Sequence, residues 1–186
     1  MLDLAGLAGY IAEHHRRDLI RVETLGRYVS ASDGVELDRY LAGEPEPDRA
    51  AKAGWLDRIG SDTAGGRVWR RLRLVPVPIT DYVRYACEWG YTDNTAAGEQ
   101  VRVLDLADAP GGAHVLAAVG DFYLLDDSHV AAMHYDAAGA FVRAEIVDEP
   151  FVEIYRAAAR AGWAISELFD EWWPRHPEHH RAAAAR

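Results

Sequence analysis

Directional hydrogen-bonding groups and aromatic side chains lie close together in residues 79–106. The candidates in this stretch are the carboxylates Glu88 and Glu99, the amide Asn94 and the aromatic residues Tyr82, Tyr85 and Trp89. Such a mixture is typical of a ligand- or peptide-binding site, where a few polar groups fix the orientation of the ligand beside apolar surface. Two carboxylates can also act as general acid and base where they converge. The alternative is that the rings fill the core and Asn94 forms a turn.

Three arginines precede this stretch, in a strand expected at residues 67–75. Arg70, Arg71 and Arg73 form a basic cluster in an otherwise acidic chain. Because a guanidinium binds phosphate or carboxylate in bidentate geometry, the cluster is a candidate anion site. Cross-strand pairing with aspartate and glutamate is the interpretation we favour. Arg70 differs from the other two because it shares a strand face with Val68 and Leu72, and it is expected to line a cavity or to pair with a buried carboxylate.

His114 and Asp121 have a spacing that occurs in a known catalytic motif. The sequence HVLAAVGD has the outline of HxKxxxxD, the motif of the phospholipase D superfamily. Leu116 stands where that motif has lysine, which would hold a phosphate as a point charge. The match therefore predicts at most a degenerate domain of that kind, one that binds a small anionic ligand.

Metal and thiol chemistry have little support in the sequence. His129 and His134 are five residues apart, so on one strand they point to opposite faces and do not form a joint site. Cys87 is the single cysteine, which excludes an intramolecular disulfide, and it is expected to be a buried apolar residue rather than a nucleophile. We expect neither a metal site nor a cofactor.

Hydrophobic periodicity predicts the elements that must position these residues. Helices are expected near 2–15, 34–41 and 50–59, after Thr80, and over 151–172; strands are expected at 18–24 and 67–75 and as an antiparallel meander of short runs from residue 100. Residues 88–99 are expected to form a corner between a helix and a strand. This order predicts an α+β domain with an antiparallel or mixed sheet, N-terminal helices and a long C-terminal helix.

Composition limits the class of protein. The formal net charge of −10 argues against direct binding of nucleic acid or of an anionic membrane. No apolar run approaches the roughly 20 residues that span a bilayer. The basic residues near the start follow the apolar run, whereas a signal peptide has them before it. We therefore expect a cytoplasmic protein with a single domain over residues 1–175 and a flexible tail over residues 176–186.

Several strings along the chain resemble a known family. RVETLGRY (21–28), RVWRRLRLVPVPITDYVRY (67–85), NTAAGEQVRVL (94–104) and GDFYLLDDSHVAAMHYDAAG (120–139) are similar to an actinobacterial family of unknown function, often encoded near helix-turn-helix regulators. The chain departs from the family pattern at Tyr123, where the family usually has tryptophan, and at Leu125, where it usually has phenylalanine. The resemblance selects the positions to test first, which are Arg71, Arg73, Asp81, Tyr82, Asn94, Gly98, Glu99, Asp121 and Asp126.

Two functions from different classes follow. The resemblance implies a non-catalytic regulatory or partner-binding protein that works with a helix-turn-helix transcriptional regulator. The alternative is an enzyme of secondary metabolism, or a degenerate phospholipase D-like domain, that binds a small anionic ligand at Arg71, Arg73, His114 and Glu99. An enclosed pocket lined by the candidate residues would favour the second function. Ion pairing among scattered candidate residues, together with an exposed patch of apolar side chains, would favour the first.

Overall fold

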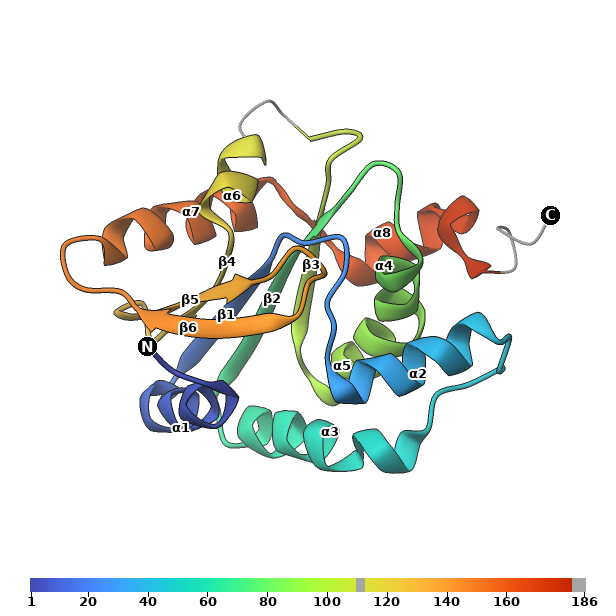
Figure 1. The fold of residues 1–186 in the computed structure, drawn as a ribbon, viewed down its shortest axis with the longest axis horizontal. Coiled ribbons are helices and arrows are strands. Elements are labelled where there is room, and N and C mark those ends of the chain that lie inside the picture. Colours follow the sequence, from blue (N-terminus) through green and yellow to red (C-terminus); the bar gives the residue numbers. More distant parts are fainter. Residues whose placement is uncertain (110–112, 182–186) are drawn as a thin grey trace.

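The protein is built around a mixed β-sheet with helices on both faces (Figure 1). The computed structural model describes residues 1–109 and 113–181. The strand order within this part of the chain is β6-β5-β4-β1-β2-β3-β7. The strands are β1 (Asp18–Glu23), β2 (Val68–Val75), β3 (Gln100–Asp105), β4 (Asp121–Leu125), β5 (His129–Tyr135), β6 (Phe141–Ile146) and β7 (Glu167–Leu168). The predicted α+β class is confirmed, and the sheet is of the mixed kind.

Helices connect the strands and cover the sheet. They are α1 (Leu4–His14), α2 (Ala31–Leu41), α3 (Arg49–Ala64), α4 (Asp81–Tyr85), the π-helical η1 (Ala86–Tyr91), α5 (Thr92–Ala97), α6 (Ala113–Val119), α7 (Val152–Ile165), α8 (Phe169–Arg175) and the 3-10 helix η2 (Pro177–His179). Local capping explains where several of them begin. The side chains of Asp3, Asp48 and Thr80 accept hydrogen bonds from the first free backbone amides of α1, α3 and α4.

The central strands run parallel because long helical connections separate them. β1 pairs with β2 and β2 pairs with β3, both in parallel. The first connection contains α2 and α3, and the second contains α4, η1 and α5. β4, β5 and β6 form an antiparallel meander whose first strand pairs with β1. The expected meander therefore covers only residues 121–146, whereas β3 belongs to the parallel part.

The two faces of the sheet differ in chemistry. One face is apolar: Val22, Leu72 and Leu74 pack in one cluster with Leu116 of α6 and with the buried side of α7. The approach is close at Gly162 of α7, where a Cβ atom would lie 2.5 Å from Leu72. The other face lies on the side of α1, α3 and the α4–α5 helices, and its central strands carry charged residues in place of apolar ones (Figure 1).

Three local predictions need correction. Residues 114–119, expected as a strand, form α6, because a short apolar run does not by itself distinguish a strand from a helix. Residues 88–99, expected as a corner, are helical as far as Ala97, and the turn is confined to Gly98 at φ 111° and the residue after it. The helix expected over 151–172 is interrupted at Ser166, where the chain becomes extended and forms the short strand β7 before α8.

The last described residues lie against the helices of the domain. Residues 176–181, assigned from the sequence to a flexible tail, contact the aromatic side chains of α8 and α2. Residues 182–186 of that tail lie outside the described residues. In the part of the chain that the structure covers, no helix combines the length and the apolar character needed to cross a bilayer.

Candidate functional site

Four charged residues meet on the polar face of the sheet because of strand register. Arg21 and Glu23 alternate along β1, and Arg71 and Arg73 alternate along β2, so all four side chains leave the same face. In the parallel pairing, Arg21 lies beside Arg71 and Glu23 lies beside Arg73. Like charges placed side by side repel, so the arrangement depends on the carboxylate that lies among them.

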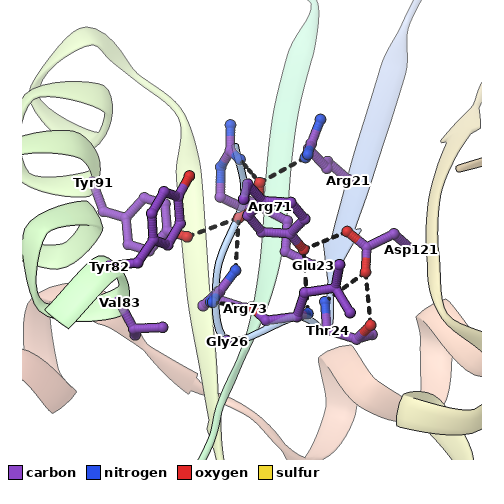
Figure 2. A network of polar contacts seen from close by, with 12 residues as sticks. Arg21, Glu23, Thr24, Gly26, Arg71, Arg73, Tyr82, Val83, Tyr91 and Asp121 are labelled. Carbon is purple, nitrogen blue, oxygen red and sulfur yellow. Dashed lines mark hydrogen bonds and ion pairs between the residues drawn. The ribbon is translucent and has the colours of Figure 1, made fainter. Parts of the chain in front are cut away.

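Glu23 is that carboxylate (Figure 2). Its Oε1 atom accepts hydrogen bonds from Arg21 Nε at 2.6 Å and from Arg71 Nη1 at 2.5 Å. Its Oε2 atom accepts a hydrogen bond from the Tyr91 hydroxyl at 2.7 Å and lies 3.8 Å from Arg73 Nη1. One buried carboxylate therefore contacts three guanidinium groups and links β1 and β2 to the helical segment that carries Tyr91.

A second carboxylate extends the network from β2 towards α5. Glu99 Oε1 accepts hydrogen bonds from Nε of Arg71 and lies 3.1 Å from its Nη2. Its Oε2 atom accepts a hydrogen bond from the side-chain amide of Asn94 at 2.6 Å. Asn94 in turn accepts a hydrogen bond from the indole of Trp55 on α3 at 3.3 Å. The predicted residues Arg71, Asn94 and Glu99 are thus joined directly.

Asp121 extends the network from the other side, through the loop that follows β1. Its Oδ1 atom accepts hydrogen bonds from the backbone amide of Thr24 at 2.8 Å and from the Thr24 hydroxyl at 2.6 Å. The hydroxyl of Tyr28 donates to Oδ2. The Tyr28 ring also lies beneath the guanidinium groups of Arg21 and Arg73, with centroid distances of 5.7 and 5.4 Å.

Arg73 is the most enclosed member of the network. Its side chain is 0% exposed and donates a hydrogen bond to the backbone carbonyl of Leu25. Its Nε and Nη1 atoms are buried without a hydrogen-bond partner among the described residues. A buried donor without an acceptor costs free energy, so Arg73 is the member with unused binding capacity.

Contacts within the network shift the pKa values of Glu23 and Arg71. Burial alone would raise the pKa of Glu23, but the guanidinium groups of Arg71, Arg21 and Arg73 outweigh it and lower that pKa to about 2. Burial likewise opposes the charge of Arg71, yet Glu23 and Glu99 raise its pKa. With three arginines and the carboxylates Glu23, Glu99 and Asp121, the formal charges cancel. Glu23 and Arg71 therefore form an ion pair and are poorly suited to exchange protons near neutral pH.

Neither the Cys87 thiol nor the possible metal ligands form a reactive group in the described residues. Burial raises the pKa of the Cys87 thiol to about 12, so the reactive thiolate is scarce. Within residues 1–109 and 113–181, no group of three or more histidine, cysteine, aspartate or glutamate side chains is arranged to hold a metal ion.

Four predicted residues form a second cluster beside the network. Tyr82, Tyr85 and Trp89 make successive edge-to-face contacts on one side of α4 and η1, with ring centroids 5.9 and 6.2 Å apart. Glu88 accepts a hydrogen bond from the hydroxyl of Tyr40 on α2. The expected common face of the aromatic residues is confirmed, and its role is to join α2 to the α4–η1 helix.

The remaining predicted residues lie elsewhere. Arg70 faces the apolar side of the sheet, where it pairs with Asp18 and lies 5.4 Å from the Trp163 ring. Asp126 Oδ1 accepts hydrogen bonds from three successive backbone amides, residues 16–18, which is a structural role. His114 is exposed on α6, on the opposite side of the sheet from the network. The HxxxxxxD outline therefore does not bring His114 and Asp121 into one site.

The network is closed rather than open to a cleft. Two shallow surface hollows in the described part of the chain lie at α3 and α5, around Gly60 and Ala97, and at β7 and α8, around Arg102 and Arg175. Neither hollow is lined by a residue of the network. The candidate residues converge as a group, but they bind one another.

Sequence reasoning missed four members of the network, namely Arg21, Glu23, Thr24 and Tyr28. A signal was present, because Arg21 and Glu23 alternate with Ile20 and Val22 in the strand that was expected at residues 18–24. That alternation places a charged pair on one face of the strand, but it does not reveal which strand lies beside it.

The fold and the network together define a small α+β protein with a closed, charge-balanced polar core. The chain belongs to the family described as a domain of unknown function, DUF6879, whose model matches residues 7–174. The network residues described above all lie within the matched region. No curated protein and no solved structure matches the chain.

Proposed function

We propose that this protein is a non-catalytic regulatory protein that acts by binding a partner, and that the partner is a helix-turn-helix transcriptional regulator. The single observation that carries this proposal is the closure of the network. Arg71, Asn94, Glu99 and Asp121 are the residues best equipped for ligand chemistry, and each is engaged by another buried side chain. Their engagement supports a structural role for them and leaves the surface as the working part of the molecule.

Charge supports the class of partner. The chain carries a formal net charge of −10, which repels the phosphate backbone of nucleic acid. A DNA-binding protein has a basic surface, so an acidic protein is complementary to it and associates rapidly through electrostatic steering. Binding of this kind would compete with DNA for the same basic surface, which is a simple route to regulation.

The proposal is tested by mixing the full chain with the helix-turn-helix protein encoded nearest to its gene. We expect a stoichiometric complex by light scattering after size exclusion, and an affinity by calorimetry that falls as salt rises. A helix-turn-helix protein encoded elsewhere in the same genome is the matched control. The proposal is contradicted if no complex forms when this chain and the neighbouring helix-turn-helix protein are each present at about 0.1 mM, where even weak pairs associate.

The alternative, an enzyme of secondary metabolism or a degenerate phospholipase D-like domain that binds a small anion, draws support from one observation. Arg73 has two buried nitrogen atoms without hydrogen-bond partners in the described structure, and an anion would satisfy them. His114 lies on the other side of the sheet and would not take part. Native mass spectrometry of the purified protein tests this function, because a stoichiometric bound anion that is lost in Arg73→Lys would favour it over partner binding.

A further inference from the structure

The last described residues of the chain cover a surface made of aromatic side chains. We call this the aromatic surface, and it consists of Tyr40 of α2, Trp89 of η1 and Trp172 and Trp173 of α8. The covering segment is residues 176–181. With this segment in place, all four aromatic side chains are at most 9% exposed. In Figure 1 the last coloured part of the chain lies beside α8 and close to α2.

Among the contacts of the covering segment, the one made by Arg181 depends most on the chemistry of the side chain. Its guanidinium carbon lies 4.5 Å from the ring centroid of Tyr40 and 5.6 Å from that of Trp89. Its Nη1 atom donates a hydrogen bond to the backbone carbonyl of Tyr40 at 2.9 Å. That carbonyl is in the last turn of α2, where the helix dipole favours a cation. Two aromatic faces and a helix end thus form a cradle for one guanidinium group.

The histidines of the covering segment stack on the rest of the surface. His180 lies over Trp173 at 4.2 Å between ring centroids, and His176 lies over Trp172 at 4.6 Å. Each histidine also has a ring nitrogen within hydrogen-bonding distance of the carbonyl of the residue beneath it. The indole N–H of Trp172 is buried, and it has no acceptor among the described residues. The covering segment therefore leaves one donor of the surface unsatisfied.

The covering segment is attached less firmly than the surface beneath it. Each residue from 176 to 181 is at least partly exposed, whereas the aromatic residues are buried. The family match ends at residue 174, so the segment lies outside the matched region and the aromatic surface lies within it. Partly exposed segments near a chain end open locally at a lower free-energy cost than the core does, so displacement of the covering segment is the step that would give a competitor access to the aromatic surface.

Carboxylate and cationic groups both border the cradle. Glu88 accepts a hydrogen bond from the Tyr40 hydroxyl. Lys52 donates to the backbone carbonyl of Trp89, and Arg84 donates to that of His179. The ring faces, rather than an excess of negative charge, therefore favour a guanidinium as the ligand group, since it stacks on aromatic rings.

We propose that the aromatic surface binds an arginine-bearing segment of the partner protein, and that the covering segment occupies this surface in the free protein as an internal competitor. The inference rests on the proposed function, and it names the surface and the chemistry of the partner. A partner arginine takes the place of Arg181 between Tyr40 and Trp89.

The test uses the full chain carrying Arg181→Glu, because a carboxylate is repelled by the ring faces and by the Tyr40 carbonyl. The probe is a synthetic peptide with the sequence of residues 176–181, HPEHHR, and the readout is the set of indole N–H resonances in a nitrogen-15 spectrum. A tethered segment has an effective concentration of about millimolar, so the wild type should bind the peptide at least about tenfold more weakly than the variant. The matched control is Arg160→Glu, which makes the same charge change in an exposed ion pair of α7.

The expected result is that the peptide shifts the Trp89 and Trp172 indole resonances in Arg181→Glu, while the wild type and Arg160→Glu show no shift. A peptide ending in alanine instead of arginine should bind at least about tenfold more weakly, since it lacks the stacked cation. Equal peptide binding by all three proteins, or no shift in a folded Arg181→Glu, would overturn the inference. If that variant does not fold, Arg181→Ala replaces it under the same criteria.

Failure of the inference and failure of the proposed function give different results. If the helix-turn-helix protein binds the wild type and Arg181→Glu with equal affinity, the partner is correct and the aromatic surface is the wrong place. If the peptide binds Arg181→Glu but the helix-turn-helix protein binds neither form, the surface recognises arginine and the proposed partner class is wrong.

Discussion

Replacing Glu23 by glutamine is the sharpest test of the buried network. The substitution keeps the shape of the side chain and removes the charge that holds Arg21, Arg71 and Arg73. Loss of one partner from a buried ion pair typically costs about 3–5 kcal/mol, because the remaining charges are left uncompensated. We therefore expect Glu23→Gln to lower the free energy of unfolding by at least about 3 kcal/mol at pH 7.

The pKa of Glu23 gives an independent magnitude. Its folded value of about 2 lies below the ordinary value of 4.5, and each unit of difference corresponds to about 1.4 kcal/mol. Because the folded pKa is lowered, the carboxylate contributes its full stabilisation, about 3 kcal/mol, above pH 4.5 and loses it as the pH falls towards 2. At pH 3 about 1 kcal/mol should remain.

The measurement is urea unfolding of both proteins at pH 7, 5 and 3, followed by tryptophan fluorescence. Glu153→Gln is the control, because Glu153 pairs with Arg156 on the surface and its loss should change stability by less than about 0.5 kcal/mol at each pH. A cost below about 1 kcal/mol for Glu23→Gln at pH 7, or a cost that is the same at pH 3 as at pH 7, would refute the assignment of Glu23 as the ionised centre of the network.

Other changes have outcomes set by local geometry. Gly139→Ala should cost about 2 kcal/mol more than Gly43→Ala in urea unfolding, because both have φ near +88° but only the first would place a Cβ atom 2.5 Å from a backbone oxygen. Cys87 should resist a disulfide reagent at pH 8 in the native protein and react after unfolding, since burial raises its pKa to about 12; rapid native labelling would disprove its burial. In urea unfolding, Asp126→Ala should lower the free energy of unfolding by about 1–3 kcal/mol. Asp126→Asn should lower it much less, because the asparagine oxygen still accepts hydrogen bonds from the backbone amides of residues 16–18.

The fold class was predictable because strong local patterns specify it. Thr80 caps α4 as expected, and the alternation in residues 18–24 and 67–75 identified the strands that became β1 and β2. Residues 114–119 were wrongly predicted as a strand because a short apolar run is compatible with a strand or a helix. In the structure they form α6, which packs on α7. The break at Ser166 was also hidden, since it depends on Arg102 of β3, which donates from Nε to the Ser166 hydroxyl at 3.1 Å.

About half of the site was visible in the sequence. Arg71, Arg73, Asn94 and Glu99 were selected in advance, and cross-strand pairing was the favoured interpretation of the arginines, which the ion pair between Arg71 and Glu23 confirms. Glu23 itself was not selected. Its importance comes from lying beside Arg73 in the parallel register of β1 and β2, and the sequence of one strand contains no information about the identity of its neighbour.

That register also offers a reason for a charged core. A buried ion-pair network stabilises a fold less than a well-packed apolar cluster of the same size would, because each charge must be removed from water. Such a network also tolerates a wrong strand register less well than an apolar cluster does. A slip of one residue between β1 and β2 would turn Arg21 and Glu23 to the apolar face against α7, where the described cluster holds Val22 and Leu72. We infer that the network specifies the parallel pairing, so the disruptive consequence of Glu23→Gln should appear as loss of a unique native state as well as loss of stability.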